Sequence, residues 1–214
     1  MQTRLNVVIV LDRSGSMQGS EEATVSAINE YFVSLKRNQS CDSFVTLKMF
    51  DSESIDTVFR SAPASDLWFN QDRFVPRAMT PLFDAVGDGI QALDEAIANG
   101  ELGALVVLTD GFENASSKFS KEEISALVRE RQEERGWLII FLAADIDAWP
   151  GAKQLGISAD RALAYSKSRS PQMSDALQAV TADYVACRDA CEVAFDDDMR
   201  KSVISSANGD KTRH

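Results

Sequence analysis

Runs of apolar residues alternate along the chain with segments whose apolar residues recur every three or four positions. Three of the runs, residues 5–11, 102–109 and 137–142, are rich in Val, Leu and Ile and show no regular alternation with polar residues. This pattern predicts strands buried on both faces of a parallel sheet, whereas the three-and-four spacing predicts amphipathic helices. Strands that alternate with helices indicate an α/β fold, namely a three-layer, doubly wound Rossmann-like fold with a mainly parallel sheet.

Two further segments predict one antiparallel pair at the edge of this sheet. Residues 44–50 and 55–59 are both strand-like, and the link Asp51-Ser52-Glu53-Ser54 is too short for a crossover helix. The second strand is therefore predicted to return antiparallel to the first. Residues 162–165 are predicted to form a last short edge strand, and residues 61–80, which lack a clean period, a long loop.

Capping residues predict where the helices begin. Ser20-Glu21-Glu22 is predicted to cap the first helix. Thr80-Pro81 is predicted to open the second, with Thr at the N-cap and Pro at the first helical position. Ser120-Lys121-Glu122-Glu123 forms a capping-box pattern before a third helix, and residues 173–191 carry the apolar stripe of a long last helix.

Length and charge limit the organisation and the partners of the protein. The chain has 214 residues, which suits one large α/β domain, predicted over residues 1–195, followed by a flexible polar tail over residues 196–214. The sequence has 22 Lys and Arg against 33 Asp and Glu, a net charge of −11. This charge disfavours binding to nucleic acid phosphate or to an anionic membrane surface.

Cysteine and histidine usage narrows the chemistry further. Three cysteines, an odd number, favour a reduced chain over a disulfide framework, and no membrane span or secretory signal is predicted, so the expected location is cytoplasmic. Cys187 and Cys191 fall in the apolar stripe of the last helix and are predicted core residues rather than a metal clamp. The single histidine, His214, argues against a Ser/His/Asp or Cys/His catalytic group.

Polar side chains follow two of the predicted buried strands and precede one helix. Asp12, Ser14 and Ser16 alternate along the segment after the first strand, so their side chains can face the same way. Thr80 precedes the second helix, and Asp110 follows the second buried strand. Because the carboxyl ends of parallel strands share one edge of the sheet, these side chains are expected to converge there. Carboxylates and hydroxyls are hard oxygen ligands, which predicts a divalent cation site.

The segment Asp12-Arg13-Ser14-Gly15-Ser16 resembles the D-x-S-x-S motif of the von Willebrand factor A (VWA) family, where it forms a metal-ion-dependent adhesion site. Thr80 and Asp110 match the threonine and the aspartate that this family supplies from its second and third loops. The resemblance covers most of residues 4–195, and residues 110–116 and 141–148 look like those of stand-alone bacterial and phage members. Phe112 departs from the pattern, since an acidic residue often stands there.

The resemblance implies a non-catalytic protein-binding module whose metal ion is held by Asp12, Ser14, Ser16, Thr80 and Asp110. The ion would be Mg²⁺, or Mn²⁺ or Ca²⁺ in its place, with an open position for a Glu or Asp of a partner protein. Direct and water-mediated coordination by Asp12, Thr80 and Asp110 are both compatible with the sequence. Similarity to cytoplasmic relatives implies an adaptor role in larger assemblies, including those with AAA+ ATPases, and leaves the oligomeric state open.

Met17, Phe112 and Glu113 flank the predicted ligands and are the candidate contacts with that partner, although burial is the commoner state of an aromatic side chain. One alternative function is a Mg²⁺-dependent phosphatase of the haloacid dehalogenase class, which also places an Asp after its first strand. Such an enzyme needs a second Asp where Ser14 stands, and a lysine that the predicted loops do not offer. An extracellular or virion-surface adhesin is the other alternative.

Overall fold

A six-stranded sheet forms the middle layer of the computed structural model, which describes residues 3–145 and 147–204. The strand order is β3-β2-β1-β4-β5-β6, in which β3 runs antiparallel to β2 and all other neighbours are parallel. The predicted α/β fold with one antiparallel edge strand is therefore confirmed. The strands are β1 (Thr3–Asp12), β2 (Cys41–Phe50), β3 (Ile55–Pro63), β4 (Leu102–Thr109), β5 (Leu138–Ala144) and β6 (Ala162–Tyr165).

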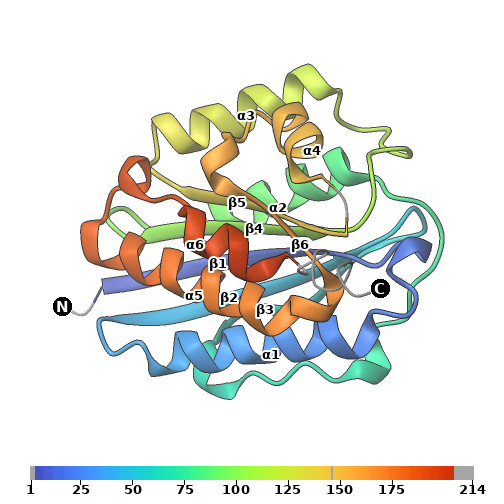
Figure 1. Ribbon diagram of the computed structural model, residues 1–214. Coiled ribbons are helices and arrows are strands. Elements are labelled where there is room, and N and C mark those ends of the chain that lie inside the picture. Colours follow the sequence, from blue (N-terminus) through green and yellow to red (C-terminus); the bar gives the residue numbers. More distant parts are fainter. Residues whose placement is uncertain (1–2, 146, 205–214) are drawn as a thin grey trace, which may run out of the picture.

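Helices cover both faces of the sheet (Figure 1). Val7 and Ile9 of β1 belong to the core beneath α1, α5 and α6, whereas Val8 and Val10 belong to the core beneath α2, α3 and α4. Both faces of β1 are thus covered, which explains its continuous apolar sequence. In the described part of the chain, no helix combines the length and apolar character that crossing a membrane requires. The helices are α1 (Glu21–Arg37), α2 (Leu82–Ala96), α3 (Lys121–Glu133), α4 (Ala148–Gln154), α5 (Ser170–Cys187) and α6 (Asp197–Val203).

The segment between β3 and α2, predicted as a long loop, is fastened to α1. Two short 3-10 helices, η2 (Ala64–Asp66) and η3 (Gln71–Arg73), interrupt it. The Asn29 side chain of α1 donates to the Phe69 carbonyl oxygen at 2.9 Å and accepts from the Phe69 amide at 2.8 Å. These bonds satisfy backbone groups that would otherwise be buried without partners, and they fix the path of the loop across α1.

The helix starts lie where the capping patterns predict them, but two of the caps differ. Ser20 holds the predicted N-cap position of α1, but its Oγ donates to the carbonyl oxygen of Met17 at 2.6 Å and makes no cap hydrogen bond to the helix. At α2 the N-cap position belongs to Pro81, not to Thr80. The predicted capping box of Ser120 and Glu123 is present at the start of α3.

The prediction that Cys187 and Cys191 lie in the core is wrong. Helix α5 ends at Cys187, and Arg188 follows in the left-handed region at φ 59°, so the helical period does not continue to Cys191. Both cysteines are exposed, and both are free.

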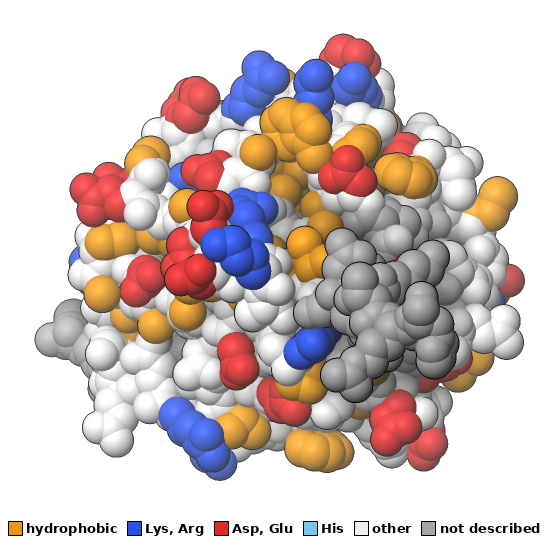
Figure 2. Space-filling model, viewed as in Figure 1, with side chains coloured by type: hydrophobic (Ala, Val, Ile, Leu, Met, Phe, Trp, Pro, Cys, Tyr) orange, Lys and Arg blue, Asp and Glu red, His pale blue; other side chains and the backbone are white. Residues whose placement is uncertain are grey.

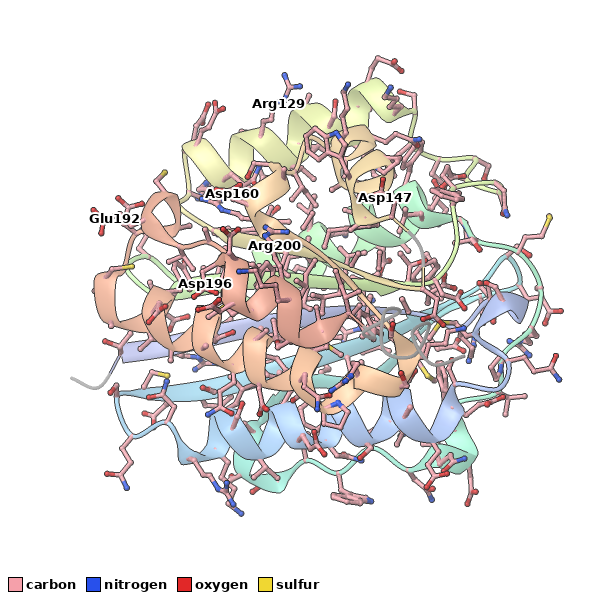
Figure 3. The ribbon with its side chains drawn as sticks, in the orientation of Figure 1. Arg129, Asp147, Asp160, Glu192, Asp196 and Arg200 are labelled. Carbon is pink, nitrogen blue, oxygen red and sulfur yellow. The ribbon has the colours of Figure 1, made fainter. Side chains whose placement is uncertain are left out.

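Residues 197–203, predicted as part of a flexible tail, form the docked helix α6. Asp196 caps its start by accepting from the amide of Met199, and Val203 at its end is fully buried. Figure 3 shows Arg200 of α6 lying beside Asp160, and Figure 2 shows acidic and basic side chains gathered over this region. The rest of the predicted tail, residues 205–214, lies outside the described residues.

The Arg200 side chain explains why this polar segment docks. Its guanidinium donates to four backbone carbonyl oxygens around the start of β6, and these bonds use nearly the whole donor fork of the group. The acceptors are the carbonyl oxygens of Phe195, Ala162, Ala159 and Asp160.

Arg200→Ala should lower the free energy of unfolding by about 1–3 kcal/mol, because the four carbonyl groups lose a charged donor. Lys201→Ala is the matched control, since Lys201 pairs with Asp198 at 3.6 Å on the open surface. It should change the free energy of unfolding by less than about 0.5 kcal/mol. Urea unfolding measures both, and equal effects would contradict the anchoring role of Arg200.

Candidate metal centre

The loop after β1 is fixed by the carboxylate of Asp12. Asp12 Oδ1 accepts from the Ser14 amide at 2.7 Å, and Oδ2 accepts from Thr109 Oγ1 at 2.6 Å. The Asp12 side chain is fully buried, so these bonds replace the water that it gives up. The tight turn places the hydroxyl oxygens of Ser14 and Ser16 3.1 Å apart.

Arg13, between the motif residues, ties this loop to the turn between β2 and β3. Its guanidinium donates to Asp51 Oδ2 at 2.8 Å and to Asp56 Oδ2 at 2.9 Å, and Arg77 Nε donates to Asp51 Oδ2 at 2.9 Å. Burial raises the pKa of Asp51, but the Arg77 hydrogen bond, two backbone amides and the charge of Arg13 outweigh it and hold that pKa below its usual range. Asp51 therefore stays ionised and keeps Arg13 in place.

The second loop places Thr80 beside the first. The Gly15 amide donates to the Ala78 carbonyl oxygen at 3.1 Å, while Ala78 itself adopts a left-handed conformation at φ 58°. Thr80 is buried and is clamped by Asn114: the Thr80 amide donates to Asn114 Oδ1 at 2.8 Å, and the Asn114 amide donates to the Thr80 carbonyl oxygen at 3.1 Å. The second and third loops are thereby held together.

The third loop, after β4, completes the group. Ser16 Oγ donates to Asp110 Oδ1 at 2.5 Å. A Cβ atom on Gly111 would lie 3.1 Å from Thr80 Oγ1, 3.5 Å from Ser16 Oγ and 3.7 Å from Asp12 Oδ2. Oxygen atoms of the first and second loops therefore lie around Gly111 of the third, and a side chain there would press on them. The structure brings together all five residues that the sequence singled out as ligands.

The donor chemistry of this group fits a small hard cation. Two carboxylates can offset a double positive charge, and three hydroxyls add neutral oxygen donors of the kind that Mg²⁺ and Ca²⁺ take. Within residues 3–145 and 147–204, no group of three or more His, Cys, Asp or Glu side chains is placed to hold a metal ion. A site here therefore depends on the serine and threonine hydroxyls, and metal binding stays a prediction.

Lys167 also lies beside these five residues, although no lysine was expected there from the sequence. It begins the short 3-10 helix η5 (Lys167–Arg169) after β6. Its Nζ donates to Asp110 Oδ2 at 2.7 Å and to the Ser16 carbonyl oxygen at 3.3 Å. The signal was the position of Lys167 two residues after the predicted edge strand 162–165, because a residue that follows a parallel strand opens on the same edge as the other loops.

No protein-family model and no curated protein matches the sequence. The structure is similar to the vWF domain of the type V pili tip protein Mfa5 from Porphyromonas gingivalis, with a TM-score of 0.67 and 10% identity over 86% of this chain and 97% of that chain. It is also similar to a von Willebrand factor type A structure from Catenulispora acidiphila, with a TM-score of 0.62 and 13% identity over 85% of this chain. The chain has the VWA fold.

A third VWA-fold match extends the comparison to another pilus protein. The PilB minor pilin from Streptococcus sanguinis has a TM-score of 0.63 and 12% identity over 86% of this chain. This chain spans 43% of the Catenulispora chain and 63% of the PilB chain. Identities this low show the shared fold alone.

The three residues predicted to contact a partner differ in how far their side chains are exposed in this VWA fold. Met17 has 0% exposure and belongs to the core beneath α1, so the prediction that it contacts a partner is wrong. Phe112 is 52% exposed, contrary to the burial that is usual for an aromatic side chain. Glu113 is engaged inside the protein, because its carboxylate accepts from the amides of Phe83 at 3.0 Å and Ser116 at 2.7 Å.

Burial raises the pKa of Asp12 to about 6. The hydrogen bonds from Thr109 and Ser14 oppose the rise, and the charge of Asp110 adds to it. An ionised Asp12 therefore costs the fold stability unless a positive charge comes close. The same feature makes the site receptive to a cation.

The substitution Asp12→Asn tests how burial of the Asp12 carboxylate affects stability. The protein is kept in EDTA so that no metal ion binds. The folded pKa of Asp12 lies above the ordinary value of 3.8, so folding favours the protonated carboxyl and the parent loses stability as the pH rises from about 4 to about 6. Relative to Asp12→Asn, the free energy of unfolding of the parent should fall by about 1–3 kcal/mol across this window. Urea unfolding at a series of pH values measures the difference, and identical pH profiles would contradict it.

Proposed function

We propose that this chain is a non-catalytic, divalent-metal-dependent protein-binding module in which Mg²⁺ bridges to an acidic residue of a partner protein. The observation that carries the proposal is the convergence of Asp12, Ser16 and Thr80 oxygen atoms around one point beside Gly111. The similar VWA domains from pilus proteins support an interaction module in general.

The five residues divide the work of holding an ion. Asp12 and Asp110 would offset its charge, while the hydroxyls fill coordination positions without adding repulsion. Asp12, Ser14 and Thr80 are buried, whereas Ser16 is exposed, so a partner reaches the site from the side of Ser16. A hard anion such as a Glu or Asp carboxylate is the natural ligand for the side of the ion that faces solvent.

Exposed apolar side chains stand next to the ligands. Phe112 follows Asp110-Gly111 and is 52% exposed, and Met79 precedes Thr80 and is 55% exposed. Apolar side chains beside a polar centre are typical of protein contact surfaces, where large side chains supply most of the binding energy. The proposed partner surface is therefore an acidic residue flanked by apolar ones.

The proposed setting is the cytoplasm of a bacterium or of a phage-infected cell, with the module serving as an adaptor of an AAA+ ATPase assembly. The support is the resemblance of its third loop to that of stand-alone VWA proteins. Cys41, Cys187 and Cys191 are all free, which agrees with a reduced chain. The alternative is an extracellular adhesin, which the pilus proteins with the same fold support.

One feature of the site favours an enzyme of the haloacid dehalogenase type, and another argues against it. Lys167 supplies a lysine at the carboxyl edge of the sheet, beside Asp110. Ser14, however, stands where such an enzyme needs its second aspartate as general acid and base, and a serine hydroxyl cannot take that role at neutral pH. The binding module therefore accounts for more of the site.

Calorimetry with MgCl₂ alone tests the metal site. The parent should bind Mg²⁺, and Asp110→Ala should weaken binding by more than about 100-fold, because loss of a ligand exceeds the effect of losing a residue that only supports one. Asp183→Ala removes the same charge from the exposed face of α5 and should bind like the parent. Circular dichroism checks that each variant is folded. If Asp110→Ala bound Mg²⁺ with the affinity of the parent, the assignment of the metal site would be wrong.

Affinity capture in Mg²⁺ and in EDTA tests the partner surface. Capture by the parent should require Mg²⁺, and Phe112→Ala should reduce capture about tenfold without changing Mg²⁺ affinity, because it removes an exposed contact beside the ion. Trp68→Ala is the matched control, since Trp68 is an exposed aromatic residue next to Phe69, which is bonded to α1. Capture that is equal in Mg²⁺ and EDTA would contradict a bridging ion.

A further inference from the structure

A positive charge of the chain itself already lies at the proposed metal site. Lys167 Nζ is 2.7 Å from Asp110 Oδ2, and the Asp110 side chain is only 3% exposed. This ammonium group also donates to the carbonyl oxygen of Ser16 at 3.3 Å. Lys167 therefore contacts both the first and the third loop of the site, the two loops that would supply most of the ligands.

The ammonium and a divalent ion would use the same carboxylate. The other oxygen of Asp110, Oδ1, accepts from Ser16 Oγ at 2.5 Å, so both oxygens of this side chain are engaged. An ion coordinated by Ser16 and Asp110 would lie within a few ångströms of the ammonium, and like charges at such short range repel strongly in a partly buried site. Full coordination by Asp110 thus requires Lys167 to withdraw.

We propose that Lys167 is a tethered competitor of the divalent cation, which sets the ion concentration at which the site loads. This inference rests on the proposed function, because it concerns the same metal site. Without an ion the ammonium offsets the charge of Asp110, and with an ion it moves into solvent. The partner's carboxylate then meets the divalent ion, whose double charge attracts a carboxylate more strongly than a singly charged ammonium group does.

The way Lys167 is held suits such an exchange. Its backbone is fixed, because its amide donates to Asp145 Oδ1 at 3.0 Å and its carbonyl oxygen accepts from Ser170 Oγ at 2.8 Å. Its side chain is 26% exposed and has four rotatable bonds, so the ammonium can leave while η5 stays in place. No rearrangement of the sheet or of its helices is needed.

A bystander role for Lys167 makes the opposite prediction. If the ammonium stayed on Asp110 Oδ2 while the ion bound through Oδ1, Lys167 would orient a ligand, and its removal would weaken metal binding. The sign of the change in Mg²⁺ affinity therefore separates the two roles.

Calorimetry with MgCl₂ on the full chain tests the proposal with three variants. Lys167→Met keeps the apolar stem and removes the charge, and it should bind Mg²⁺ about tenfold more tightly than the parent. Lys167→Arg keeps a cation beside Asp110 and should bind no more tightly than the parent. Lys36→Met, at the far end of α1, removes the same charge away from the site and should match the parent.

Thermal unfolding gives a second readout that does not depend on the partner. Lys167→Met should melt several degrees below the parent in EDTA, because Asp110 is left buried without a cation, and saturating Mg²⁺ should raise its melting temperature more than that of the parent. Equal or weaker Mg²⁺ binding by Lys167→Met would overturn the competitor role while leaving the metal site standing. Absence of Mg²⁺ binding by every variant would overturn the proposed function and this inference together.

Discussion

The hydrogen bond between Asp12 and Thr109 joins the two central strands at the carboxyl edge of the sheet. Strand β2 pairs with one side of β1 and β4 with the other, so the chain turns away from β1 in both directions at this edge. Loops that diverge in this way leave a crevice, which is where α/β sheets place their sites. A carboxylate fixed in that crevice brings a negative charge into a buried place, and the surrounding loops are arranged around it.

Charge explains how these loops are assembled. Asp51 is paired with Arg13 and Arg77, and Asp110 is paired with Lys167, so two carboxylates near this edge have cations from the chain itself. Asp12 is bonded by a hydroxyl and an amide, which are weaker compensation for a buried charge. The carboxylate with the weakest charge compensation, Asp12, therefore lies where the three loops meet.

The sheet and the five oxygen-bearing residues could be predicted because both follow from local pattern. Apolar runs mark buried strands, and a polar residue just after a parallel strand must open at the carboxyl edge. Lys167, which follows β6, could have been found by the same rule, whereas Arg13 and Asn114 act through contacts between distant segments, which no periodicity records. The exposure of Cys191 depended on where a helix ends, and the docking of α6 depended on one arginine reaching backbone oxygens; single-residue effects of this kind override an average pattern.

Gly111 makes this arrangement sensitive to a very small change. An added methyl group there would lie 3.1 Å from the Thr80 hydroxyl oxygen, closer than side-chain carbons ordinarily come to their neighbours. The group would press on Thr80, Ser16 and Asp12, the last at the end of β1, whereas Gly111 itself lies outside the helices and strands. A related chain with alanine at this position could therefore fold and yet lose the proposed metal site. A glycine here thus distinguishes related sequences that keep the site from those that have lost it.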